Sequence, residues 1–246
     1  MYTGTKSVDQ LASRAPTMAS LDAAPVTLEH VEIVTVVYEV AAHANEAVLP
    51  PGLHPTMPPV MTWSVWRCGD SPWGPFAMAQ ARIECRSGMR PRGFLVSAAV
   101  DSDDAAAALT EGWGYACRPG TVTVDRSYDR ASVRVAGADG TSILEIEVVD
   151  PVTLRTGDIQ WIANMHLAHT PMGLRLIQVD PDVEVHRAER ARPRVVSFDA
   201  AAWGEPLLEP VYPVAASLAR ASVTLPKLRY VCAPDQLAFF STEVIA

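Results

Sequence analysis

Hydrophobic and polar residues alternate in short stretches along most of the chain, and turn-forming residues separate these stretches. Residues 27–40 are dense in Val, Ile and Thr, and residues 60–67 and 76–85 alternate with a period of two. Both patterns are typical of β-strands. Further strands are expected at 94–100, 121–125, 131–136, 142–149, 161–168, 174–179, 183–189, 192–198 and 227–232. Many short strands at regular spacing predict a mainly antiparallel β-barrel, whose interior can hold a ligand cavity.

A few short helices are expected between these strands. Residues 43–48 form one, which ends at residues 50–52 because consecutive prolines cannot continue a helix. Ser102 is a suitable N-cap for an alanine-rich helix that runs to Leu109. A third helix is expected at residues 206–221.

The first 25 residues differ in composition from the rest of the chain. Residues 1–25 mix Ser, Thr, Asp and Ala, so they are predicted to form a flexible arm with one helical turn around residues 7–14. Neither an internal repeat nor a linker divides the remainder. We therefore expect residues 26–246 to form a single domain, since all-β barrels of this size are routinely single.

Composition and charge exclude several classes of protein. The net charge of −8 argues against binding to nucleic acid, because the phosphate backbone attracts clusters of Lys and Arg. No apolar run reaches the roughly 18 residues that span a bilayer, so no membrane segment is expected. Four cysteines without a C-x-x-C pair indicate neither a zinc site nor a disulfide framework, and they fit a reducing cytoplasm. We expect neither a metal nor a cofactor.

The segment EGWGYACRPG, residues 111–120, follows a predicted helix and carries the most specific pattern in the chain. It resembles the lysine motif of the acetoacetate decarboxylase family, E-x-x-(G/A)-(Y/F)-P-K-K, which carries a Schiff-base lysine. Glu111, Gly114 and Tyr115 fit this motif. The segments LPPGLHP, WIANMHLAHT and VYPVAASLARASVTLPKLRYV resemble further family segments in the same order. The resemblance implies the family's barrel around a central cavity, and a homo-oligomer.

Departures from the family pattern indicate that its chemistry is lost. Cys117 stands at the Schiff-base lysine, and Arg118 stands at the neighbouring lysine. On the same register, Trp63 and Met78 replace two acidic residues, and Val31 replaces an arginine of the cavity. An imine needs a primary amine, and the only two lysines of the chain lie near its ends. The sequence therefore argues against decarboxylation through a Schiff base.

The family register predicts a chamber lined mostly by aromatic and apolar side chains. The predicted substrate-binding residues are Val31, Trp63, Phe76, Met78, Gln80, Trp113, Trp161, Asn164 and Met165. From their residue types alone, most of these side chains would be assigned to a hydrophobic core. Only the resemblance to the family implies that they line a ligand cavity. Such a lining suits a larger and less charged substrate than a small keto acid.

Five polar residues are candidate catalytic groups, namely Tyr115, Arg118, His166, Cys117 and Glu111. Cys117 is either a nucleophile, whose pKa Arg118 lowers, or a buried and inert cysteine. His166 is either an acid or base in the cavity or an ordinary core or surface histidine. Glu111 either transfers protons or anchors the turn that presents residues 113–118.

We interpret the chain as an enzyme of specialised metabolism that keeps a decarboxylase-like barrel without amine chemistry. The expected reaction is cyclisation, dehydration or isomerisation of an apolar, polyketide-like small molecule. A shaped cavity promotes such reactions by holding a flexible substrate in a reactive conformation. Two alternatives stay open: a non-catalytic sensor or carrier that uses the same pocket, and covalent catalysis by Cys117.

Overall fold

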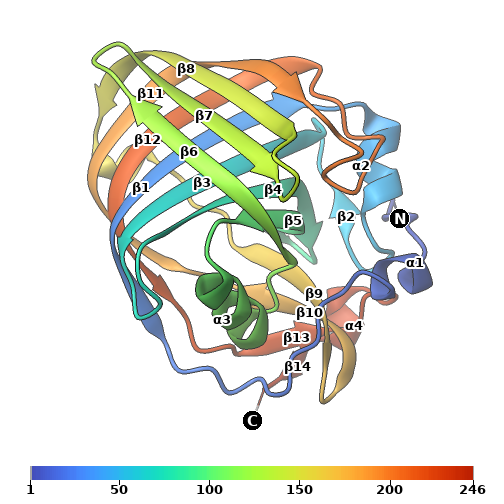
Figure 1. Ribbon diagram of the computed structural model, residues 1–246. Coiled ribbons are helices and arrows are strands. Elements are labelled where there is room, and N and C mark those ends of the chain that lie inside the picture. The colour runs from blue at the N-terminus through green and yellow to red at the C-terminus, as the bar shows by residue number, and fades with distance from the viewer. Residues whose placement is uncertain (1, 246) are drawn as a thin grey trace.

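The computed structural model describes residues 2–245, and strands dominate it (Figure 1). The strands are β1 (Val26–Glu39), β2 (His54–Pro55), β3 (Val60–Asp70), β4 (Phe76–Ser87), β5 (Arg90–Val100), β6 (Cys117–Arg126), β7 (Arg130–Gly137), β8 (Ser142–Leu154), β9 (Asn164–Thr170), β10 (Gly173–Val179), β11 (Asp182–Phe198), β12 (Tyr212–Leu225), β13 (Tyr230–Cys232) and β14 (Glu243–Val244). The helices are α1 (Val8–Ala12), α2 (Ala42–Val48), α3 (Asp103–Trp113) and α4 (Ala238–Ser241). The prediction of a mainly β fold is confirmed.

Most of the strands form a closed ring. The ring runs in the order β5-β6-β7-β8-β11-β12-β1-β3-β4 and closes where β4 pairs with β5. Its neighbours are antiparallel except for β5 and β6, which are parallel because α3 carries the chain back across the sheet. Strands β9, β10, β13 and β14 continue the sheet from β5 and lie beside α3 (Figure 1).

Strands β1, β3 and β4 are buried on both faces, and their successive side chains enter two different hydrophobic clusters. One face contributes Val36, Trp63 and Ala79 to a cluster shared with β6, β7 and β8, which we call the ring core. The other face contributes Val31 and Met78 to a cluster shared with α3 and β10, which we call the outer core. Because successive side chains point to opposite faces of a sheet, neighbouring residues of β3 or β4 enter different cores.

The prediction of a helix at residues 206–221 is wrong. Residues 212–225 form β12, which pairs with β1 on one side and with β11 on the other. Their alanines and arginine are good helix formers, but pairing on both edges overrides such local preferences. The two strands expected at 183–189 and 192–198 are one long strand, β11, whose pairing with β8 shifts register between Arg190 and Arg192.

The N-terminal residues pack onto the sheet. Leu11 and Met18 are buried, and the Met18 N–H donates to the His169 carbonyl at 2.8 Å. The Gly4 N–H donates to the Leu53 carbonyl at 2.9 Å. The prediction of a flexible arm is therefore wrong for residues 2–25, since buried apolar side chains and backbone hydrogen bonds hold them.

Helix α3 ends one turn later than expected, where Gly114 takes up a left-handed conformation with φ of 68°. A Cβ at Gly114 would lie 3.0 Å from Met18 Sδ and 3.1 Å from Ile177 Cδ1. The glycine therefore allows both the turn and the close approach of these side chains. Tyr115, the next residue, enters the outer core.

No helix within residues 2–245 is sufficiently long and apolar to cross a membrane.

Substitution of the two glycines of this region should have opposite effects on stability. We expect Gly114→Ala to destabilise the fold by about 2–3 kcal/mol, because the left-handed φ and the crowding at Met18 both oppose a Cβ. Gly112→Ala should stabilise it by about 0.5–1 kcal/mol, because Gly112 lies in a helix and a Cβ there meets only Ala23 at 3.6 Å. Urea unfolding measures both, and effects of the same sign would contradict this account.

Candidate functional site

A small pocket opens beside the outer core, between β1, β3, β4 and the loop that precedes β9. Its volume is about 160 Å³, and we call it the rim pocket. Val37, Val60 and Trp161 supply apolar walls, while Arg82 and Glu84 supply its charges. Arg82 and Glu84 lie two residues apart on β4, so they share one face of the strand.

The Glu84 carboxyl group is enclosed by protein. Its residue is 6 % exposed, and the Thr62 hydroxyl donates to Glu84 Oε1 at 2.8 Å. Among the described residues, Glu84 Oε2 has no hydrogen-bond partner. Burial raises the pKa of Glu84, and the charge of Arg82 and the hydroxyl of Thr62 only partly oppose that shift. The raised pKa makes the Glu84 carboxylate a stronger base than a carboxylate in water.

The Arg82 guanidinium group has one neutral partner and a pocket in front of it. Its Nη1 donates to Asn164 Oδ1 at 2.6 Å, whereas Nε has no partner within residues 2–245. Gly93 makes room for this side chain, because a Cβ there would lie 3.3 Å from Arg82 Cδ. No ion pair within 4.0 Å joins Arg82 to Glu84 in the described part of the chain. The guanidinium group is therefore available to an oxygen atom in the rim pocket.

Asn164 links this pair to a buried polar cluster. Its Nδ2 donates to Gln80 Oε1 at 3.5 Å, and both amides are buried. The structure therefore brings together two of the residues predicted to bind substrate, next to an arginine that was not predicted.

Tyr115 and His166 form a second buried pair. Their rings pack edge to face with centroids 4.2 Å apart. His166 Nδ1 lies 2.8 Å from the Trp113 carbonyl oxygen, which can only accept, so Nδ1 carries the proton and Nε2 is an acceptor. Burial lowers the pKa of His166 to about 4 and raises that of Tyr115. Within residues 2–245, neither His166 Nε2 nor the Tyr115 hydroxyl has a hydrogen-bond partner.

Side chains fill the space at the positions where the resemblance placed an open chamber. Val31 and Met78 are completely buried, and they pack with Phe76 and Trp113 in the outer core. Trp161 lies at its edge and lines the rim pocket. The family-aligned positions are thus close together, but large apolar side chains occupy the volume between them.

Trp63 and Met165 do not lie with the other predicted binding residues. Both belong to the ring core, because β3 and β9 turn these positions away from the outer core. Trp66, which pairs with Met78 in the sheet, is the tryptophan of β3 that faces the outer core. The assignment of Trp63 to the same chamber as Met78 is therefore wrong, because the two side chains lie on opposite faces of the sheet.

Cys117 and Arg118 line a separate surface groove of about 380 Å³, beside the N-terminal segment. Arg118 stacks over the Trp203 ring at 4.6 Å from its centroid and donates to the Ala202 carbonyl. Burial raises the pKa of the Cys117 thiol to about 11, with slight opposition from Thr110. The expectation that Arg118 lowers this pKa is wrong, because its guanidinium group is held against Trp203.

Glu111 lies on the exposed side of α3. It makes no side-chain hydrogen bond or ion pair among residues 2–245. Neither a part in proton transfer nor one in anchoring the turn fits this position.

Thr62, Arg82 and Glu84 were not among the residues predicted from the sequence. The available signal was a pair of opposite charges, two residues apart, in an otherwise apolar strand that alternates. No group of three or more His, Cys, Asp or Glu side chains within the described range is arranged to hold a metal ion.

Comparison with known proteins identifies relatives over almost the whole chain. The family model described as acetoacetate decarboxylase (ADC) matches residues 13–231. No curated protein sequence matches the chain.

Several solved structures share the fold. A structure from structural studies of acetoacetate decarboxylase is 20% identical with a TM-score of 0.75, and the match covers 98% of this chain and 95% of that one. The acetoacetate decarboxylase of Legionella pneumophila subsp. pneumophila str. Philadelphia 1 is 18% identical with a TM-score of 0.73, covering 86% and 88%. The enduracididine biosynthesis enzyme MppR, complexed with pyruvate, is 20% identical with a TM-score of 0.71, covering 87% and 97%.

The thiol of Cys117 should react slowly at neutral pH. A pKa of about 11 leaves roughly 100-fold less thiolate than an unperturbed cysteine has. We expect iodoacetamide to alkylate Cys117 correspondingly slowly at pH 7, and the rate to rise about tenfold per pH unit up to pH 10. Peptide mass spectrometry, with Cys117→Ser as the control, measures this. Rapid labelling at pH 7 would show instead that the thiol is activated.

Proposed function

The chain belongs to the acetoacetate decarboxylase family, and from that premise we propose an enzyme that uses the family fold for acid–base chemistry on a carbonyl compound. Schiff-base chemistry would need a primary amine at the site. Lys6 instead pairs with Glu205 at 2.9 Å, and Lys227 pairs with Asp22 at 3.2 Å. Neither lysine lines the rim pocket.

The observation that carries this proposal is the presence of Glu84 and Arg82 in one small pocket. The Glu84 carboxylate would remove a proton from the carbon next to a substrate carbonyl. The N–H groups of Arg82 would stabilise the negative charge that develops on the carbonyl oxygen. Burial of Glu84 supports this role, because it raises the pKa of the carboxyl group and so makes the carboxylate a stronger base.

Cyclisation, dehydration and isomerisation can all start from the enolate that this step produces. The apolar walls at Val37, Val60 and Trp161 support a mostly apolar, polyketide-like substrate. A volume of about 160 Å³ accommodates only the reactive end of such a molecule. A larger substrate would require the loop at residues 159–162 to move outward. The fold shared with MppR, an enduracididine biosynthesis enzyme, supports a role in specialised metabolism.

The second candidate function is non-catalytic binding, as in a sensor or carrier. It is favoured by the packed side chains at Val31 and Met78, which leave little room for a reaction chamber. Covalent catalysis by Cys117 has less support, because the thiol lies outside the rim pocket and its pKa is about 11.

Substitution of the two charged residues should separate these functions. We would incubate the protein with a panel of apolar carbonyl compounds and follow their conversion by mass spectrometry. Glu84→Gln is expected to lower kcat by about 100-fold or more, since general acid–base catalysis contributes that much. Arg82→Met should lower it by about 100- to 1,000-fold, as for loss of an oxyanion donor.

Cys117→Ser serves as the matched control and should change kcat less than about twofold. Full activity of Glu84→Gln would refute the assignment of the base. A compound that binds and is recovered unchanged from every variant would favour the sensor or carrier.

A further inference from the structure

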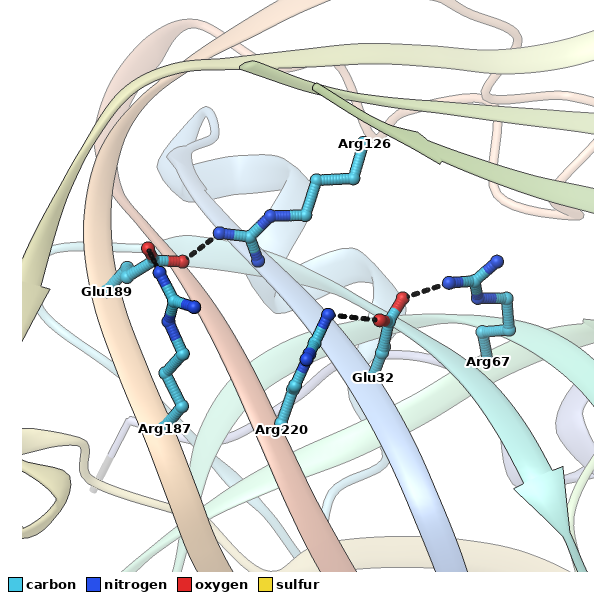
Figure 2. A network of polar contacts seen from close by, with 6 residues as sticks. All are labelled: Glu32, Arg67, Arg126, Arg187, Glu189 and Arg220. Carbon is cyan, nitrogen blue, oxygen red and sulfur yellow. Dashed lines mark hydrogen bonds and ion pairs between the residues drawn. The ribbon is translucent and has the colours of Figure 1, made fainter. Parts of the chain in front are cut away.

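Four arginines and two glutamates form a network on the ring-core face of the sheet, beyond its apolar part (Figure 2). Glu32 lies on the same face of β1 as Val34 and Val36, and in the sheet register it stands between Arg67 of β3 and Arg220 of β12. Figure 2 shows Arg126, from β6, reaching toward Glu189 of β11 from above this face. The network therefore begins where the ring core ends.

The two carboxylates of the network are shared among four guanidinium groups. Glu189 accepts from Arg126 through Oε2 and from Arg187 through Oε1, the latter at 2.9 Å. Glu32 Oε1 lies 3.3 Å from Arg220 Nη2, and Glu32 Oε2 contacts Arg67. Four positive and two negative charges leave a surplus of two positive charges, in a chain whose net charge is −8.

A pocket of about 520 Å³ lies over the network, and we call it the arginine pocket. Its cations are Arg126, Arg187 and Arg220, and its anions are Glu189, Asp129 and Asp150. The two aspartates are each paired with an arginine outside the lining, Asp129 with Arg130 at 3.8 Å and Asp150 with Arg192. The two aspartates are therefore paired with cations outside the pocket, and Glu189 is the acid of the lining that pairs with its arginines.

Ion pairs hold the arginines of the pocket in place and leave some of their N–H donors free to bind a ligand. Each guanidinium group has five N–H donors, and each carboxylate contact of Arg187 or Arg220 uses one nitrogen. Glu189 is 5 % exposed. Although burial alone would raise the pKa of Glu189, hydrogen bonds and charge from Arg126 and Arg187 outweigh it and lower the pKa. Glu189 thus stays ionised and fixes two of the three arginines before any ligand arrives.

We propose that the arginine pocket binds the phosphate or diphosphate group of a small molecule. Guanidinium groups that reach the pocket from β6, β11 and β12 can each bind a different oxygen of a tetrahedral phosphate, whereas a planar carboxylate is satisfied by one of them. The arginine pocket shares no lining residue with the rim pocket. It is a second site, independent of the proposed reaction.

Titration of the protein with pyrophosphate, by isothermal calorimetry at low ionic strength, tests this assignment. One site per chain is expected, with affinity reduced about tenfold in Arg187→Met and in Arg220→Met. Both side chains are 56% exposed, so their loss should leave the fold intact. Arg134→Met is the control of equal charge, because Arg134 is 65% exposed, pairs with Asp125 and lies outside the pocket.

Removal of a carboxylate that competes with pyrophosphate for an arginine should raise the affinity for pyrophosphate. Glu32→Gln releases Arg220 and is expected to tighten pyrophosphate binding several-fold, while Asp125→Asn, which removes the same charge elsewhere, should not.

Three results would overturn the assignment: absence of binding, equal loss of affinity in Arg134→Met, or equal affinity for acetate. Because binding is measured without turnover, the outcome does not depend on the reaction proposed for the rim pocket.

Discussion

Closure of the ring through β4 is the constraint on which the site depends. Strand β4 pairs with β3 on one edge and with β5 on the other, and both of its faces are covered by apolar clusters. Two charged residues on such a strand have no route to bulk water except through a pocket. Arg82 and Glu84 are therefore held where desolvation is costly, with Thr62 and Asn164 supplying hydrogen bonds in place of water. Charges retained under such conditions are more informative about function than charges on the surface.

The sequence was sufficient for the elements whose local pattern agrees with their surroundings. Strands β1 and β3 to β10 overlap the segments predicted from alternation, and α2 and α3 follow their proline and N-cap signals, whereas the two-residue strand β2 was not predicted. It failed for β12, where alanine and arginine favour a helix but β1 and β11 impose a strand from both sides. It also failed for residues 2–25, because their few apolar residues gave no sign that Leu11 and Met18 are buried.

Some of the residues predicted to form the site lie close together in the structure, and others do not. Gln80 contacts Asn164, and Tyr115 contacts His166. Trp63 was assigned to the same chamber as Met78, but the alternation of side chains places these two residues on opposite faces of the sheet. Arg82 and Glu84 have no counterpart in the motifs that carry the resemblance, and periodicity alone does not reveal that both faces of a strand are covered.

The pairing of β1 with β12 joins the first long strand to the last, with Val26 opposite Leu225. Contacts between residues so far apart in sequence form late, because a long loop must close before they gain any free energy. During synthesis, β1 therefore emerges long before its neighbour and presents an unpaired edge until almost the whole chain has left the ribosome. An edge of this length is prone to association with other chains. The yield of folded protein in the cell should thus depend on how well the unpaired edge of the nascent β1 is protected from association with other chains.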